Sequence, residues 1–123
     1  MNQPIVRRSS LTPLKLAKTI AEIVADMKAE DIAILDMRKV ANFCDYFVIL
    51  SANSDRQVRG LAGAVVDGLK DLGIKSVLKQ GVKEGAWVVL DAGDVLTHIF
   101  QKDLREFYQL EYLWQEAKVV KWP

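Results

Sequence analysis

Residues 45–62, DYFVILSANSDRQVRGLA, join a strand to a helix and decide the fold. Within them, residues 46–50 (YFVIL) are rich in β-formers and apolar throughout, which is typical of a central strand covered on both faces. Ser54 and Gln57 form a capping box, in which Ser54 accepts from an amide of the first turn and Gln57 reaches back to the Ser54 amide. Apolar residues then recur at helical spacing as far as Gly73, a typical helix stop.

Upstream of this unit, Thr12 and Pro13 are typical of a helix start, because Thr caps well and Pro at the first position loses no needed hydrogen bond. A helix to about Ala29 is predicted by one apolar stripe, made of Leu16, Ile20, Ile23, Val24 and Met27. Residues 31–36 (DIAILD) then predict a short, largely buried strand.

Downstream, residues 75–80 predict a weak strand and residues 81–85 a glycine-flanked turn. Two strands, 86–91 and 94–101, flank the turn Ala92-Gly93 and indicate a hairpin. A short helix from Asp103 follows, and residues 110–114 continue as helix or helical turn.

This order of elements predicts a single α+β domain, with one mixed sheet of about five strands flanked by helices. We expect a flexible N-terminal tail (1–11), the domain (12–116) and a C-terminal tail (117–123).

Composition excludes several classes of protein. The 123 residues carry 17 Lys plus Arg against 16 Asp plus Glu, a formal charge of +1, which argues against a broadly basic nucleic-acid binder. With one cysteine and one histidine, neither an intrachain disulfide nor a structural zinc site can form. No stretch has the apolar length of a secretory signal or a membrane span, so we expect a cytoplasmic protein without a membrane partner.

Three residue types could carry chemistry. Asp91 and Asp94 flank the hairpin turn, where paired carboxylates could hold a metal, although aspartate also favours turns for its own backbone hydrogen bonds. His98 shares a strand face with Leu96 and Phe100, which favours a packed residue or a binding contact over a catalytic base. Cys44 lacks any nucleophile signature, and no phosphate-binding glycine loop is present, so we expect no metal and no cofactor.

Aromatic residues gather on the hairpin and near the C-terminus. Trp87 opens a hairpin strand, and Tyr108, Tyr112 and Trp114 lie beside Arg105 and Glu111. The spacing of four between Tyr108 and Tyr112 predicts that part of this group is core. Trp, Tyr and Arg are also the usual anchors of protein interfaces.

Three stretches together resemble the ribosomal silencing factor family, also called Iojap-like proteins. They are DYFVILSANSDRQVRGLA (45–62), GAWVVLDAGDVLTHIF (85–100) and REFYQLEYLW (105–114), and the resemblance covers about residues 13–116. It implies a mixed sheet with flanking helices, nucleotidyltransferase-like in shape. The catalytic residues of that shape are missing, because the chain has no Asp-x-Asp pair.

The resemblance also implies a function. Family members bind the large ribosomal subunit through ribosomal protein fourteen, which sterically prevents the subunits from joining and holds translation back. The family's distinctive residues correspond here to Asp45, Tyr46, Ser54, Arg56, Trp87, Asp91, Asp94, His98, Arg105, Tyr108, Glu111 and Trp114. Of these we expect Ser54 to act by capping and Tyr46 and Trp114 to be core, and the others to be candidates for the partner-binding surface, with Trp87 as its apolar anchor.

Other interpretations stay open at this point. One is a nucleotide-binding enzyme on the same fold, which would need carboxylates gathered in a cleft. Another is direct RNA binding through the cations of the two tails, Arg7, Arg8, Lys118 and Lys121. We also expect that the hydrophobic docking surface could pair two copies of the chain in the absence of a ribosome.

Overall fold

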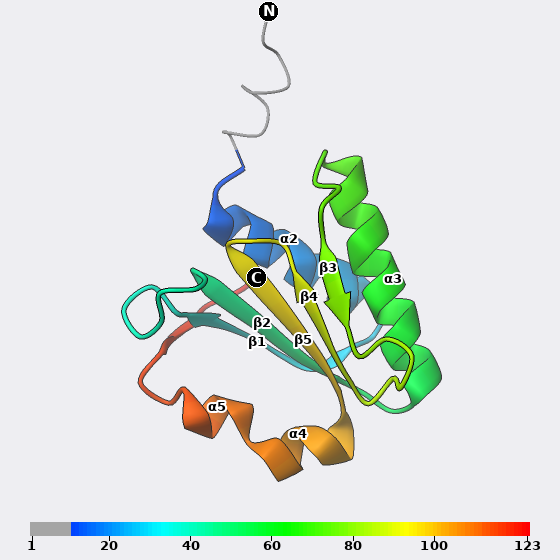
Figure 1. The fold of residues 1–123 in the computed structure, drawn as a ribbon. Helices are drawn as coiled ribbons and strands as arrows, with labels where there is room; N and C mark the ends of the chain where they lie inside the picture. Colours follow the sequence, from blue (N-terminus) through cyan, green and yellow to red (C-terminus); the bar gives the residue numbers. More distant parts are fainter. Residues whose placement is uncertain (1–10) are drawn as a thin grey trace, which may run out of the picture.

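A computed structural model describes residues 11–123 and shows one mixed sheet with helices on both faces (Figure 1). The elements are α2 (Pro13–Asp26), β1 (Glu30–Asp36), β2 (Tyr46–Ala52), α3 (Asp55–Asp71), β3 (Leu78–Gln80), β4 (Trp87–Asp91), β5 (Val95–Gln101), α4 (Lys102–Tyr108), α5 (Leu110–Leu113) and β6 (Lys118–Val120). The strand order is β3-β4-β5-β2-β1-β6. The predicted α+β class with a mixed sheet and flanking helices is confirmed. The expected tail 1–11 lies outside the described residues except for Leu11.

Strand β2 is the centre of the sheet, as its apolar run predicts. All of its residues are buried, and it pairs in parallel with β5 on one side and antiparallel with β1 on the other. Because β2 and β5 run in parallel, their carboxyl ends lie at the same end of the sheet, where α3 and α4 begin.

Helices α2 and α3 cover one face of the sheet and start at the predicted caps. The Thr12 hydroxyl accepts from the Lys15 amide, and the Ser54 hydroxyl accepts from the Gln57 amide at 3.1 Å. Gln57 reaches back to the amide of Asn53, one residue earlier than the capping box predicts. Met27 was expected in the apolar stripe but is exposed, because α2 ends at Asp26 and the chain turns at the next residues.

The hairpin of β4 and β5 forms around Ala92-Gly93 as predicted, with Trp87 opposite Phe100 and Val89 opposite His98. On the outer side of β4, the weak strand β3 covers only 78–80 and forms one edge of the sheet.

The sheet has six strands, one more than expected. The additional strand, β6, comes from residues assigned to a C-terminal tail, and it pairs antiparallel with β1. Ala117, just before it, is buried. A strand of three residues with two exposed side chains shows no alternation that would reveal it in the sequence.

Two cores lie on opposite faces of the sheet. The larger one packs α2 and α3 against the sheet. The smaller one includes Phe47, Ile49 and Phe100, with half-buried Leu104, Leu110 and Trp114 from the C-terminal segment packed on it. Helices α4 and α5 therefore lie on the second face, on the far side of the sheet from α2 and α3 (Figure 1). No helix within residues 11–123 has the length and apolar character needed to cross a membrane.

Candidate functional site

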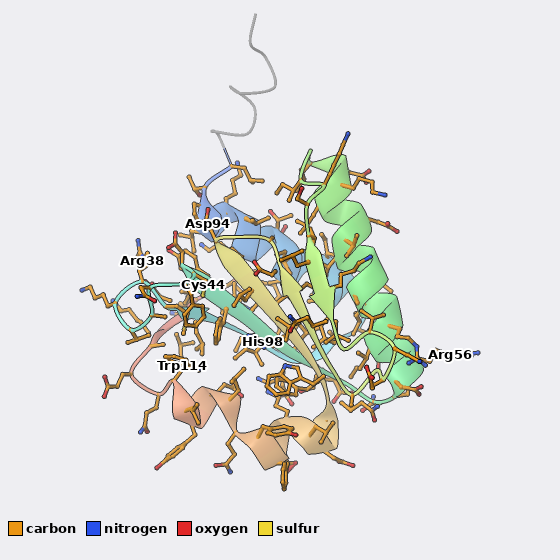
Figure 2. All side chains as sticks on the ribbon, viewed as in Figure 1. Arg38, Cys44, Arg56, Asp94, His98 and Trp114 are labelled. Atoms are coloured by element: carbon orange, nitrogen blue, oxygen red, sulfur yellow. The ribbon has the colours of Figure 1, made fainter. Side chains whose placement is uncertain are left out.

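The predicted partner-binding residues do not form one site. The structure places Asp45, Asp91 and Asp94 at the hairpin-turn end of the sheet, Trp87, His98 and Tyr108 on its second face, and Arg56, Arg105 and Glu111 at the opposite end. Figure 2 shows this separation, with Asp94 and Arg56 far apart and His98 between them.

The acidic residues at the hairpin end hold the turn together. The Asp91 carboxylate accepts from the Gly93 amide at 2.8 Å, which is the turn role of aspartate. The backbone carbonyl of Asp94 accepts from the amides of Asp45 and Tyr46 at 2.7 and 3.1 Å, so it ties the hairpin to the start of β2. Across residues 11–123, the structure contains no group of three or more side chains suited to a metal ion.

Cys44 is buried beside these acids, and its thiol has low reactivity. Burial raises the pKa of its thiol to about 11, and the negative charges of Asp45, Asp91 and Asp94 act in the same direction. The nucleophile is the thiolate, and this environment keeps the thiol protonated at neutral pH. The structure therefore favours the structural interpretation of Cys44.

On the second face, Trp87 and His98 form a hydrogen-bonded pair. The indole N–H of Trp87 donates to Nδ1 of His98 at 3.2 Å, so the ring proton of the neutral histidine lies on Nε2. His98 is only 6% exposed, and its ring contacts Phe47 edge-on at 4.5 Å. Burial lowers the pKa of His98 from 6.5 to about 4, so the imidazole is neutral at physiological pH. A neutral, packed His98 fixes the orientation of Trp87.

Around Trp87 lies a surface of exposed rings. The Trp87 ring stacks on Phe100 at 4.8 Å, and Tyr108 of α4 contacts it at 5.1 Å. Phe107 packs edge-on against Tyr108 and is itself 77% exposed. We call Trp87, Phe107 and Tyr108 the aromatic surface.

The C-terminal aromatic group was predicted to be partly core, and its core contact comes from Trp114, whereas Tyr108 and Tyr112 are exposed. Tyr108 is 48% and Tyr112 is 66% exposed. The physical reason is the left-handed conformation of Gln109 (φ 48°), which ends α4 and starts α5. The spacing of four residues therefore spans two short helices and not one. Trp114, expected as core, is half-buried against Phe47, with ring centroids 6.0 Å apart.

At the opposite end of the sheet, Arg105 and Glu111 bind each other. The guanidinium Nε and Nη2 donate to the two carboxylate oxygens of Glu111 at 3.0 and 2.8 Å. Nη1 of Arg105 donates to the Ser51 hydroxyl and to the backbone carbonyl of Asp31. An open groove of about 520 Å³ adjoins them, lined also by Lys102, Glu106, Gln109 and Tyr112. Arg56, on α3, is exposed and lies on the other face of the sheet.

Sequence reasoning missed two features of this region. Phe107 was not singled out, although its position beside Tyr108 in a short helix was a usable signal for an exposed aromatic pair. The bonds of Arg105 to Ser51 and Asp31 join residues 54 and 74 positions apart, and no local pattern predicts them.

Comparison with known proteins gives consistent matches. Residues 10–123 match the family model described as "Ribosomal silencing factor during starvation". The chain is 42% identical over 107 residues to ribosomal silencing factor RsfS of Bacillus subtilis, covering 84% of this chain and 91% of that protein. It is 33% identical to the chloroplastic protein Iojap of Zea mays, covering 89% of this chain and 48% of that protein.

Solved structures agree with the fold. A crystal structure of a Chromobacterium violaceum protein superposes with a TM-score of 0.81 at 32% identity, covering 85% of this chain and 87% of that one. A Bacillus halodurans protein superposes with a TM-score of 0.72 at 34% identity, covering 88% of this chain and 95% of that one.

Proposed function

The chain belongs to the ribosomal silencing factor family, and from this premise we propose that it binds the large ribosomal subunit through ribosomal protein fourteen. Occupying that protein sterically keeps the small subunit away and represses translation. Blocking subunit joining requires binding alone, and we propose that the protein catalyses no reaction. The protonated thiol of Cys44 and the engagement of Asp91 in its turn support a non-enzymatic role.

The aromatic surface is the observation that carries the proposal. Trp87 is half-buried and held from three sides, by the Phe100 stack, the Tyr108 ring and the hydrogen bond to His98. A side chain fixed in this way loses little conformational entropy when a partner covers it, which is the property of an interface anchor.

The negative charge of Asp91 lies on the same face of the sheet as Trp87 and suits a basic partner. Trp87, Val89 and Asp91 are each two positions apart along β4, so their side chains point to the same side of the sheet. Each of them is half-exposed. Complementary charge steers association and fixes register, so an acidic residue beside an apolar anchor suits a basic ribosomal protein.

We place the protein where free large subunits occur, in the cytoplasm, and expect no direct nucleic-acid specificity. When no ribosome is present, the same aromatic surface pairs two copies of the chain. Sedimentation equilibrium of the isolated protein tests this pairing, because Phe107→Ser should then shift a dimer toward monomer.

Substitution of Trp87 tests the docking role. Trp87→Ala should raise the dissociation constant for the large subunit by roughly thirtyfold, the effect of losing about 2 kcal/mol at a hot spot. Trp87→Phe should retain part of the affinity because the ring still stacks on Phe100. Met27→Ala is the control, since Met27 is exposed at the end of α2 on the other side of the sheet. Unchanged affinity in a folded Trp87→Ala variant would reject Trp87 as the anchor.

A further inference from the structure

We propose that Arg105 is a positioning residue, which clamps α4 and α5 onto the sheet and so sets the aromatic surface, and that Arg105 and Glu111 do not themselves contact the ribosome. This inference rests on the proposed function, because it assigns a role within the docking surface. It changes the expectation from sequence, which placed both residues among the partner-binding contacts.

The four hydrogen bonds of Arg105 go to groups of this chain, and its side chain is 11% exposed, whereas that of Glu111 is 42% exposed. The two bonds to Glu111 reach α5, and the Nη1 bonds at 2.8 and 2.5 Å reach the Ser51 hydroxyl of β2 and the Asp31 carbonyl of β1. Planar two-point bonding to a carboxylate is among the strongest hydrogen-bonding arrangements available to a side chain. One guanidinium therefore joins α4 to three other elements.

The sheet is locally shaped to receive this guanidinium. The pairing of β1 with β2 shifts register between Glu30 and Ala33, and Asp31 within this irregularity has a positive φ of 51°. A residue in a bulge leaves the regular ladder of hydrogen bonds. The Asp31 carbonyl is thereby available to Arg105, beside the Ser51 hydroxyl at the end of β2.

Helices α4 and α5 need such a clamp. Neither helix has a fully buried residue or a side-chain cap at its start, and α5 has only four residues. Helices this short are not stable alone in water. Their apolar contacts with the sheet come from half-buried Leu104 and Leu110, from Trp114 just after α5, and from the Tyr108 ring against Trp87. The directional bonds of Arg105 therefore add to these contacts in holding Tyr108 against Trp87, and with it Phe107, which packs on Tyr108.

The neighbouring Lys102 offers a matched contrast. It lies on the same helix and lines the same groove, but it is exposed and its ion pair with Glu30 is loose, at 3.5 Å. Lys102→Gln removes one positive charge from the groove without touching the clamp. Arg105→Lys keeps the charge but cannot bind Glu111 at two points, and Glu111→Gln keeps the side-chain shape but weakens the charged bonds.

Hydrogen exchange in the free protein and affinity for purified large subunits together test the clamp. In Arg105→Lys and Glu111→Gln, we expect amide exchange over residues 102–116 to speed up by roughly tenfold, the order expected from losing a charged hydrogen bond. Exchange in β2 and β5 should stay unchanged. Affinity for the large subunit should fall at least about threefold in both variants, because a smaller fraction of the protein has its helices in the docking position. Lys102→Gln should match the wild type in the exchange assay.

The remaining outcomes separate the alternatives. Lower affinity with unchanged exchange would mean that Arg105 or Glu111 touches the ribosome directly, and would overturn the proposal. Faster exchange with unchanged affinity would show a clamp that does not serve docking, which also overturns it. If the wild-type protein fails to bind the large subunit, the proposed function and the docking role both fall, and the exchange data alone then decide whether the clamp exists.

Discussion

Acid should destabilise this protein through His98. Its folded-state pKa of about 4 lies below the value of 6.5 for an exposed histidine, because the ring is buried. Between these values the unfolded chain binds a proton that the folded chain excludes, so stability is complete above pH 6.5 and declines as the pH falls toward 4. Each pKa unit corresponds to about 1.4 kcal/mol, so the lowered pKa of His98 corresponds to a loss of about 3 kcal/mol of unfolding free energy in acid.

The geometry explains why the proton is excluded. Nδ1 of His98 accepts the hydrogen bond from the Trp87 N–H. Protonation would place a hydrogen on Nδ1, so that two N–H donors would face each other. Urea unfolding at pH 7, 5.5 and 4.5 measures the loss. Other groups contribute as well, since the hydrogen bond from Arg38 lowers the pKa of Asp36, and the stability from that carboxylate is lost as the pH falls through its folded pKa.

The contribution of His98 is therefore the difference between the wild type and His98→Gln. Glutamine does not titrate, and its amide oxygen can accept the Trp87 N–H in place of Nδ1. The variant should have a flatter profile between pH 6.5 and 4.5. If the two profiles run parallel in this range, His98 is not a buried neutral residue and does not hold Trp87 through Nδ1.

Two further predictions concern the scaffold. Gly73 and Gly81 both have positive φ, near 85°, but a Cβ at Gly73 would meet open space and one at Gly81 would collide with the Trp87 carbonyl oxygen. Gly73→Ala should lower the free energy of unfolding by about 1 kcal/mol. Gly81→Ala should lower it by clearly more and should also weaken docking, because the collision displaces Trp87. Equal losses of unfolding free energy in urea for the two variants would contradict this. Ser54→Ala should cost about 1 kcal/mol by removing the cap of α3, whereas Ser54→Asp should retain stability in the same assay.

The regular elements were predictable from sequence because their signals are local. The apolar run of β2, the caps at Thr12 and Ser54, and the turn Ala92-Gly93 each depend on residues a few positions apart. The same locality explains the errors. The break at Gln109 depends on one left-handed residue, and β6 is recognisable only from its pairing with β1.

The candidate site was only partly predictable. Trp87 was correctly placed on the hairpin, and its register opposite Phe100 follows from the turn. Asp94 and Arg105, both predicted as partner-binding residues, lie beyond opposite ends of β5, and a strand of this length spans roughly 20 Å. The internal role of Arg105 depends on contacts across 54 and 74 positions, which appear only when the sheet is assembled.

The proposed block of subunit joining can be measured with purified ribosomal subunits. Purified large and small subunits are mixed with an excess of this protein and separated on a sucrose gradient. We expect that the protein sediments with the large subunit, that the joined-ribosome peak falls, and that Trp87→Ala restores the peak. A protein that stays at the top of the gradient while joining proceeds normally would rule out the proposed block of subunit joining.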